Sequence, residues 1–309
     1  MDRTFHIVTC VANPIGWASR VKLARDAIAN WLKEPNVHVT LVECAYGARG
    51  YELADLASDR VTHVPVRATT LVWNKENLLN LGITRLPHNA RYVGTFDADV
   101  KYRSPGWARA ILAALDIYPA IQPWTHTIDL GPNDEVLATH KSFAAIYHAG
   151  RPVGEPANSP YEFAHPGYAW AWTRDALDRI GGLFELGGMG SGDHHMALAI
   201  AGKADCSLPG TIDSSYSTAV KRWERHAATH INGKLGFITA TLEHDFHGRK
   251  SNRGYQSRWG MFIDHAFDPF NDLKRNSFGV IEFSGEKPAL ERAFDRYLRS
   301  REEDVNTNT

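Results

Sequence analysis

The sequence predicts an α/β fold built on a mostly parallel central sheet with helices on both faces. Up to residue 125, short β-rich runs alternate with segments of helical spacing, and this order requires right-handed crossovers between parallel strands. Hydrophobic residues make up 43% of the 309 residues, which is enough core material for one large α/β domain or two small ones.

Each element of the first half has its own local signal. Val, Ile, Leu and Phe dominate the expected strands, whereas apolar residues recur every three or four positions in the expected helices. Asn-Pro and Pro-Asn pairs separate several of these segments. We expect strands at 5–11, 37–44, 61–66, 91–96 and 120–124, and helices at 19–32, 74–86 and 107–115.

The second half shows weaker patterns. Residues 125–166 are rich in Pro, Gly, Asn and His and predict a long loop-rich segment with one helix at 141–148. Further on we expect a strand at 167–172, helices at 174–180, 193–201 and 288–300, and a disordered tail at 301–309. We expect one domain at 1–265, divided into 1–125 and 126–265, and a helical extension at 266–300.

Composition excludes several classes of protein. The formal charge is −1, which argues against nucleic-acid binding over the whole surface. Three widely spaced cysteines predict no disulfide framework and indicate a reducing cytoplasm. The first residues do not resemble a signal peptide, and no run of about 18 apolar residues predicts a membrane span. Neither standard glycine-rich phosphate loop occurs, so a bound nucleotide would need a metal ion at its phosphates.

Two aspartates follow the expected strand 91–96, in the run "YVGTFDADV". Ligands of open α/β sheets bind at the carboxyl ends of strands, where Asp97 and Asp99 would lie. Two carboxylates suit a divalent cation that carries phosphates. A helix cap beside a surface acid is the plainer interpretation.

The segment Trp73 to Ile83, "WNKENLLNLGI", resembles the "FNRAKLLNVGF" type of segment in metal-dependent β-1,4-galactosyltransferases. Lys75 stands where that family has Arg, and the matching positions are Asn74, Leu78, Leu79, Asn80 and Gly82. In that family the segment touches the nucleotide-sugar donor, and a cation at a helix start suits a diphosphate. An ordinary amphipathic helix is the alternative.

A second resemblance lies in "GGLFELGGMGSGDHHMALAIAGK", Gly181 to Lys203. Family-2-like glycosyltransferases of the GT-A fold place Gly-x-Gly-Glu-Asp before a helix, and the matching residues here are Gly190, Gly192, Asp193 and His194. The usual Glu-Asp pair is replaced, so either Asp193 or His194 is the expected general base. A plain N-cap at Asp193 is the alternative.

GT-A enzymes often supply a late histidine to the metal, and His247 is our first choice and His244 our second. Carboxylates together with imidazoles suit Mn²⁺ better than Mg²⁺. The nearby basic residues, Arg249, Lys250, Arg253 and Arg258, predict a loop over the diphosphate. Binding of an anionic acceptor such as DNA and a solvated charged surface are the alternatives.

The resemblance implies a Rossmann-like GT-A fold with a loop-rich acceptor-binding half, and it implies four sets of site residues. The metal ligands would be Asp97, Asp99, His247 and His244, and the catalytic residues Asp193 and His194. The donor-binding set is Thr9, Val11, Asn13, Glu43, Asn74, Lys75, Asp97, Ala98, Arg249 and Arg253. The acceptor-binding set is Trp124, Tyr168, Trp170, Gly190 and Gly192, for which core packing is an equal explanation. Asp129 and His165 are candidates without an assigned role.

The implied reaction transfers a sugar from a nucleotide diphosphate sugar, UDP-linked, to an acceptor hydroxyl with inversion, aided by Mn²⁺ or Mg²⁺. Small molecules, glycans and hydroxymethylated bases of bacteriophage DNA all fit as acceptors, in a bacterial or phage-infected cytoplasm and without a membrane partner. A nucleotidyltransferase and a non-catalytic sugar- or nucleic-acid-binding protein are the rival functions. The oligomeric state is left open.

Overall fold

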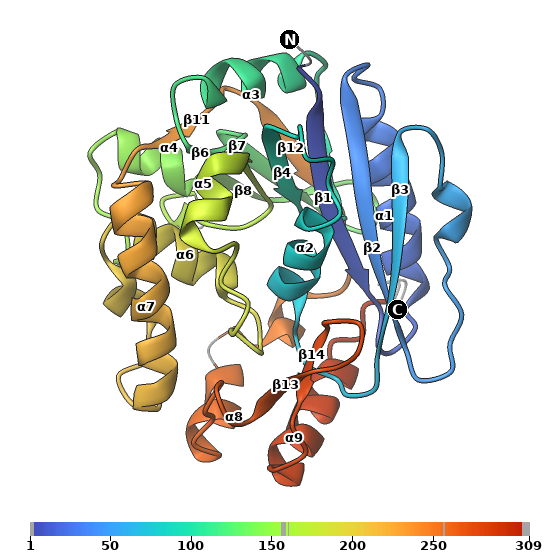
Figure 1. The fold of residues 1–309 in the computed structure, drawn as a ribbon, viewed down its shortest axis with the longest axis vertical. Coiled ribbons are helices and arrows are strands. Elements are labelled where there is room, and N and C mark those ends of the chain that lie inside the picture. Colours follow the sequence, from blue (N-terminus) through green and yellow to red (C-terminus); the bar gives the residue numbers. More distant parts are fainter. Residues whose placement is uncertain (1–2, 156–158, 160, 256, 305–309) are drawn as a thin grey trace.

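The computed structural model describes residues 3–155, 159, 161–255 and 257–304, and its centre is a seven-stranded sheet (Figure 1). The strand order is β11-β6-β10-β4-β1-β2-β3, and all neighbours are parallel except β10, which is antiparallel to β4 and β6. The mostly parallel α/β fold is therefore confirmed. The strands are β1 Phe5–Ala12, β2 Val37–Tyr46, β3 Val61–Ala68, β4 Tyr92–Phe96, β6 Ala120–Gln122, β10 Ala169–Thr173 and β11 Leu235–Phe237.

Helices cover both faces of this sheet because its strands alternate their side chains between two apolar layers. Phe5 and Ile7 of β1 pack on one face with Trp31 of α1, whereas Val8 packs on the other with Leu79 of α2. The helices of the first half are α1 Ala18–Trp31, α2 Lys75–Ile83 and α3 Trp107–Leu115.

A second sheet of five strands replaces much of the loop-rich segment expected at 125–166. Its order is β5-β12-β7-β8-β9, with β7 and β8 forming an antiparallel pair. The strands are β5 Val100–Tyr102, β7 His126–Leu130, β8 Val136–Ser142, β9 Ala164–His165 and β12 Thr241–His244. The expectation was wrong because β7 inverts the usual pattern: it buries its polar residues, Thr127 and Asp129, and leaves Ile128 and Leu130 only half-buried. Residues 156–158 and 160 of that segment lie outside the described part of the chain.

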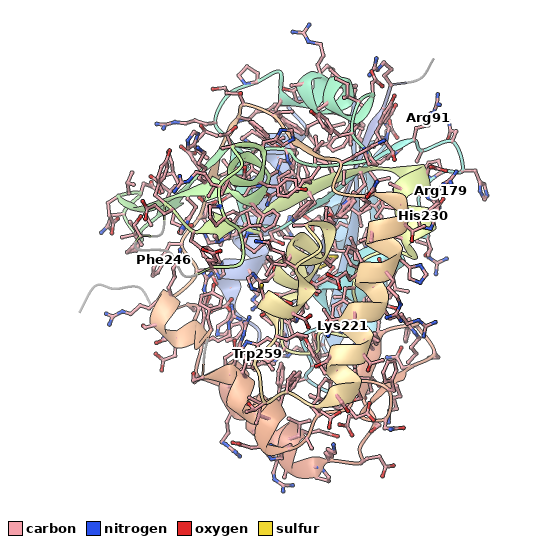
Figure 2. All side chains as sticks on the ribbon, turned by 90° about the vertical axis from the view of Figure 1, so that its left-hand side faces the viewer. Arg91, Arg179, Lys221, His230, Phe246 and Trp259 are labelled. Atoms are coloured by element: carbon pink, nitrogen blue, oxygen red, sulfur yellow. The ribbon has the colours of Figure 1, made fainter. Side chains whose placement is uncertain are left out.

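The remaining helices pack on one side of the central sheet and below it in Figure 1. They are α4 Phe143–His148, α5 Arg174–Ile180, α6 Gly192–Ile200, α7 Ser214–His230, α8 Arg258–Asp264 and α9 Pro288–Arg299. Short 3₁₀ helices lie at Ala54–Leu56, Ala204–Ser207 and Lys250–Arg253. Trp259, which is labelled in Figure 2, joins α8 to its neighbours by edge contacts with His195 of α6 and Tyr216 of α7.

The C-terminal part differs from expectation in two ways. The expected helical extension 266–300 contains a β-hairpin, β13 Leu273–Arg275 with β14 Ile281–Phe283, before α9. The expected tail is not free at its start, because Arg301 and Glu303 are only 5% and 3% exposed. Glu303 forms ion pairs with Arg20 of α1 and with Arg301, and the distant partner Arg20 cannot be read from the local composition. Residues 305–309 lie outside the described residues.

Within the described residues, the structure has no helix that is both long enough and apolar enough to cross a membrane.

Candidate active site

A cavity of about 240 Å³ opens where β1 and β4 end. Its wall takes residues from the end of β1, the start of α2, the turn after β4, the loop before α6 and the chain after β12. Both expected halves of the domain therefore contribute to it. The position agrees with the rule that open α/β sheets bind ligands at the carboxyl ends of their strands.

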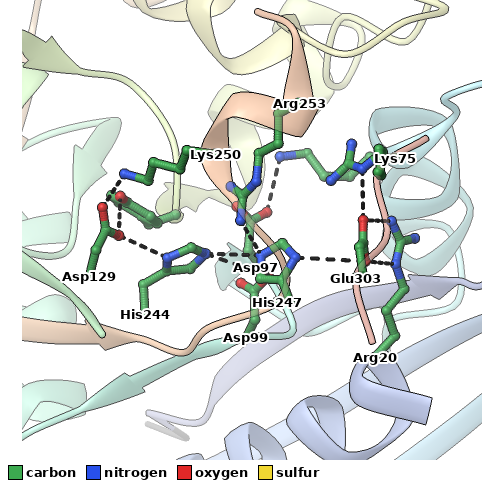
Figure 3. Close-up of polar contacts among 12 residues, drawn as sticks. Arg20, Lys75, Asp97, Asp99, Asp129, His244, His247, Lys250, Arg253 and Glu303 are labelled. Carbon is green, nitrogen blue, oxygen red and sulfur yellow. Dashed lines mark hydrogen bonds and ion pairs between the residues drawn. The ribbon is translucent and has the colours of Figure 1, made fainter. Parts of the chain in front are cut away.

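Three of the four predicted metal ligands meet at one point of this cavity (Figure 3). The Asp99 Oδ2 atom lies 3.0 Å from His247 Nε2 and 3.7 Å from His244 Nε2, and the two Nε2 atoms are 3.2 Å apart. Two ligand atoms that each lie about 2.1 Å from one ion are separated by about 3.0–3.6 Å. Asp99 Oδ1 is buried without a hydrogen-bond partner in the described structure. The donor set and its spacing therefore fit a divalent cation.

Carboxylates stand behind both imidazole rings. His244 Nδ1 lies 2.8 Å from Asp129 Oδ1, and His247 Nδ1 lies 3.7 Å from Glu303 Oε2. A carboxylate on one ring nitrogen fixes the tautomer that leaves the other nitrogen free for a metal. Asp129, which had no assigned role in the sequence, thus orients His244.

The two histidines also decide the charge of Asp99. Burial raises the pKa of this carboxyl, but His244 and His247 outweigh that effect and hold the pKa well below its usual value. Burial likewise lowers the pKa of His244, whereas Asp99 and Asp129 raise it to about 9. Without a cation, the two histidines therefore stabilise the ionised form of Asp99.

Asp97, the fourth predicted ligand, lies outside the cluster formed by Asp99 and the histidines. Its Oδ1 atom accepts a hydrogen bond of 3.0 Å from Lys75 Nζ, and the same amine lies 3.9 Å from Glu76 Oε1. Burial lowers the pKa of Lys75, but Asp97, Asp193 and Glu76 reverse this and raise it well above its ordinary value. One ammonium group therefore faces three carboxyl groups.

Glu76 is a site residue that the sequence analysis missed. Its side chain is 3% exposed and lines the cavity, and burial raises its pKa to about 7. A Cβ at Gly192 would lie 2.5 Å from the Glu76 Cδ atom, so only glycine allows this close packing. An acid in the first turn of a helix is ordinary, and therefore nothing in the local sequence singled it out.

The two candidate bases at the start of α6 face different cavities. Asp193 lines the cavity that holds Asp99, whereas His194 lines a neighbouring one together with Phe163. Burial raises the pKa of Asp193, yet Lys75, His165 and His194 outweigh it and lower the pKa. Burial lowers the pKa of His194. The ionised Asp193 is therefore the group placed to meet a ligand beside Asp99.

The predicted donor-binding residues fall into two groups. The cavity is lined by Val11, Asn74, Lys75, Asp97, Ala98 and Arg253. Thr9, Asn13, Glu43 and Arg249 are not among its lining residues. Thr9 Oγ1 donates to Phe96 O at 2.8 Å, and Glu43 binds His63 at 2.7 Å. Asn13 closes a turn by accepting from Trp17 N at 2.9 Å, and the Arg249 side chain is exposed.

The predicted acceptor platform is only partly present. Tyr168 and Gly190 line the cavity, but Trp124, Trp170 and Gly192 do not. Trp124 is fully buried with its Nε1 atom 3.2 Å from Ala169 O, and Trp170 Nε1 lies 2.7 Å from Pro166 O. Core packing explains both tryptophans. His165, which had no assigned role, lines the cavity and stacks on Tyr168 with ring centroids 4.2 Å apart.

Arg20, Arg301 and Glu303 were also missed by the sequence analysis. Arg20 and Arg301 line the cavity, and both bind Glu303. Arg20 lies in α1, whereas Arg301 and Glu303 lie close together in the C-terminal tail, so no local pattern links Arg20 to the other two.

Comparisons with known proteins find no matching family model and no matching curated protein. Among solved structures, the chain is similar to a mannosyltransferase of Pyrobaculum calidifontis in complex with GDP-Man and Mn²⁺, at 14% identity and a TM-score of 0.43, covering 84% of this chain and 60% of that one. It is also similar to the catalytic domain of Drosophila β1,4-galactosyltransferase 7 in complex with xylobiose, at 11% identity and a TM-score of 0.39. This match covers 93% of this chain and 97% of that chain.

A third similar structure is the 4-diphosphocytidyl-2C-methyl-D-erythritol synthase of Anaerococcus prevotii. The identity is 11% and the TM-score 0.35, with 77% of this chain and 88% of that chain covered. The chain thus spans 60% of the mannosyltransferase, and all three likenesses have TM-scores of 0.43 or less. They concern the general arrangement of the chain and carry no argument about its activity.

Proposed function

We propose that this chain is a metal-dependent glycosyltransferase that moves a sugar from a nucleotide diphosphate sugar, UDP-linked, to an acceptor hydroxyl with inversion. One observation supports this above all: Asp99, His244 and His247 share a single cavity with a separate ionised carboxylate, Asp193. A cation site beside a candidate base suits inverting glycosyl transfer from a nucleotide diphosphate sugar.

The donor would lie in the cavity at the carboxyl ends of β1 and β4. Asp99, His244 and His247 would hold Mn²⁺, which supplies neutralising charge for the departing diphosphate. Lys250 and Arg253 line the same wall and would bind phosphate oxygens. The aromatic residues Tyr46 and Trp73 also line the cavity and offer flat faces for the nucleoside.

The acceptor hydroxyl would approach from the side of Asp193. This carboxylate would take the proton as the hydroxyl attacks, because its lowered pKa keeps it ionised at neutral pH. A single displacement with a base opposite the leaving group inverts the sugar. The acceptor is a small molecule, a glycan or a hydroxymethylated base of phage DNA. The three described cysteines are unpaired, which fits the proposed cytoplasmic setting.

A thermal-shift panel of nucleotide sugars with Mn²⁺, Mg²⁺, Fe²⁺, Zn²⁺ or a chelator tests the proposal. Fe²⁺ and Zn²⁺ belong in the panel because two histidines and one carboxylate also suit them. A true donor stabilises the protein by about 2.7 kcal/mol at a hundredfold excess over its Kd. The proposal fails if nucleotide-sugar binding is unchanged by the chelator.

Product analysis separates the rival functions. A glycosyltransferase releases a nucleoside diphosphate from its donor, whereas a nucleotidyltransferase releases pyrophosphate from a nucleoside triphosphate. A protein that only binds its ligand releases neither. Incubation with small glycosides, oligosaccharides and hydroxymethylated DNA, followed by mass spectrometry, then identifies the acceptor class.

A further inference from the structure

The last described residues, 301–304, lie beside His247 and Gly248, and we call them the C-terminal strap. Glu303 is its buried centre, with 3% of its surface exposed. Its carboxylate accepts from Arg20 Nε at 2.6 Å, Arg20 Nη2 at 2.8 Å and Arg301 Nε at 2.7 Å. The Oε2 atom also lies 3.7 Å from His247 Nδ1, on the side of the ring away from Asp99 (Figure 3).

Asp304 fastens the strap to the start of α1. The backbone N–H groups of Ala18 and Ser19 donate to its two carboxylate oxygens at 2.8 Å each. Trp17, which precedes this helix, provides no side-chain cap of its own. The first N–H groups of a helix need acceptors, and here the acceptor comes from the far end of the chain.

Gly248 shows how closely the strap approaches the metal ligands. This residue directly follows His247 and has a φ of +86°. A Cβ added there would lie 3.1 Å from Glu303 Cα and 3.2 Å from the carbonyl oxygen of Arg301. A larger residue would therefore push the strap away from the chain that carries His247.

Each ligand histidine has a carboxylate near its Nδ1 atom, at 2.8 Å for His244 and at 3.7 Å for His247. His244 is backed by Asp129 of the second sheet, and His247 is backed by Glu303 of the strap. The arginines that hold Glu303 keep it ionised, although burial by itself would raise its pKa. Arg301 also lies 4.8 Å from the ring of Trp73, at the edge of the donor cavity.

We propose that the C-terminal strap is a positioning element of the metal site, in which Glu303 orients His247 for ligation and Asp304 locks the strap onto α1. This inference rests on the metal site of the proposed function. Carboxylates behind ligand histidines fix the ring and increase its affinity for the ion, and their loss typically costs 10–100-fold in metal affinity. The strap thereby couples cation binding to the N-terminus of α1.

Titration calorimetry of the nucleotide-free protein with Mn²⁺ tests this role. We expect Glu303→Gln to weaken Mn²⁺ binding about 10–100-fold. Glu302→Gln is the matched control, because it removes the same charge from the exposed neighbouring residue and should leave the affinity within about twofold. A chain that ends at residue 304 keeps every described strap contact and should bind like the full chain.

Hydrogen exchange gives a readout that needs no variant. Coupling between two sites is reciprocal, so Mn²⁺ must tighten the strap if the strap tightens Mn²⁺. We expect Mn²⁺ to slow exchange of the Ala18 and Ser19 amides, which donate to Asp304. A purely structural strap would leave this exchange unchanged by the ion.

The outcomes are distinguishable. If the wild-type protein binds Mn²⁺ while Glu303→Gln binds it equally well, or if bound Mn²⁺ leaves the two amides unprotected, the strap has no positioning role. If the wild-type protein binds no divalent cation, the metal site itself is wrong, and the strap proposal is overturned with it. If Glu303→Gln does not fold, the hydrogen-exchange experiment on the wild-type protein tests the proposal instead.

Discussion

The two ends of the cavity differ in how their charged groups are compensated. At the metal end, Asp99 faces two histidines whose outer nitrogens each face a buried carboxylate. At the lysine end, Lys75 faces three carboxyl groups, Asp97, Glu76 and Asp193. His165 and His194 also act on Asp193. The metal end has its ligands oriented in advance, whereas the lysine end carries an excess of acid over base.

The difference assigns different chemistry to each end. At the metal end the ligands are already oriented, and Asp99 Oδ1 is a buried oxygen without a hydrogen-bond partner in the described structure. This arrangement suits a tightly held cation. A crowd of carboxyl groups around one amine spreads their pKa values, because burial and mutual repulsion act on each group differently. The pKa of Glu76 is raised to about 7, while the pKa of Asp193 is lowered. Two carboxyl groups whose pKa values differ in this way suit the binding and deprotonation of a hydroxyl.

The largest expected effect is at Asp193. Asp193→Asn should lower kcat by about 10²–10⁴-fold, because the variant loses the proton acceptor in the main cavity. His194→Gln, whose side chain faces the neighbouring cavity, should change kcat by less than about threefold. Steady-state kinetics with the donor that the thermal-shift panel identifies measures both. Equal, mild losses would remove the start of α6 from the chemistry.

Asp99→Asn tests the metal end in isolation. We expect Mn²⁺ affinity to fall by more than about 100-fold, since even the loss of a group behind a ligand costs 10–100-fold. The fold should persist, as judged by circular dichroism and calorimetric titration of the same sample. Asp245→Asn is the control, because Asp245 is a nearby buried acid that pairs with Lys101 instead. Retained Mn²⁺ affinity in Asp99→Asn would contradict the assignment.

Glu76→Gln tests the lysine end through the pH dependence of the free energy of unfolding. An ordinary glutamate has a pKa of 4.5, whereas folded Glu76 has one of about 7. Between these values the folded chain keeps a proton that the unfolded chain has lost, so stability falls as pH rises from about 4.5 to about 7 and then levels off. At pH 8 the ionisation of Glu76 lowers the free energy of unfolding by about 3 kcal/mol, and Glu76→Gln lacks this loss.

Urea unfolding at pH 4 and pH 8 measures the effect. The wild-type protein should lose about 3 kcal/mol more than Glu76→Gln between the two values. An identical pH dependence in both proteins would show that Glu76 ionises normally.

The smallest expected effect concerns Arg253. Its Nη2 atom lies 2.9 Å from His247 Nε2, the nitrogen that would bind the cation. Arg253→Gln should therefore raise Mn²⁺ affinity of the nucleotide-free protein by about tenfold, while it weakens donor binding. Calorimetry in the absence and presence of a nucleotide separates the two changes. Unaltered Mn²⁺ affinity would mean that the guanidinium does not compete for His247.

Local patterns in the chain were enough to predict most strands of the central sheet and the position of its acids. Strand and helix periodicities are local, and they predicted the parallel strands and the turn that carries Asp97 and Asp99. The late histidines followed from a resemblance, and the structure brings both to Asp99. The same reasoning misplaced Trp124 and Trp170, because an aromatic strand face looks the same whether it packs a core or lines a cavity.

The charged groups that support the metal cluster come together only through long-range folding. Asp129 and His244 are 115 positions apart, and Arg20 and Glu303 are 283 apart. A buried charge is tolerated only where distant partners compensate it, and no pattern within a few residues reveals such a partner. For this reason an acidic tail that reads as disordered becomes, at Glu303, part of the wall behind a metal ligand.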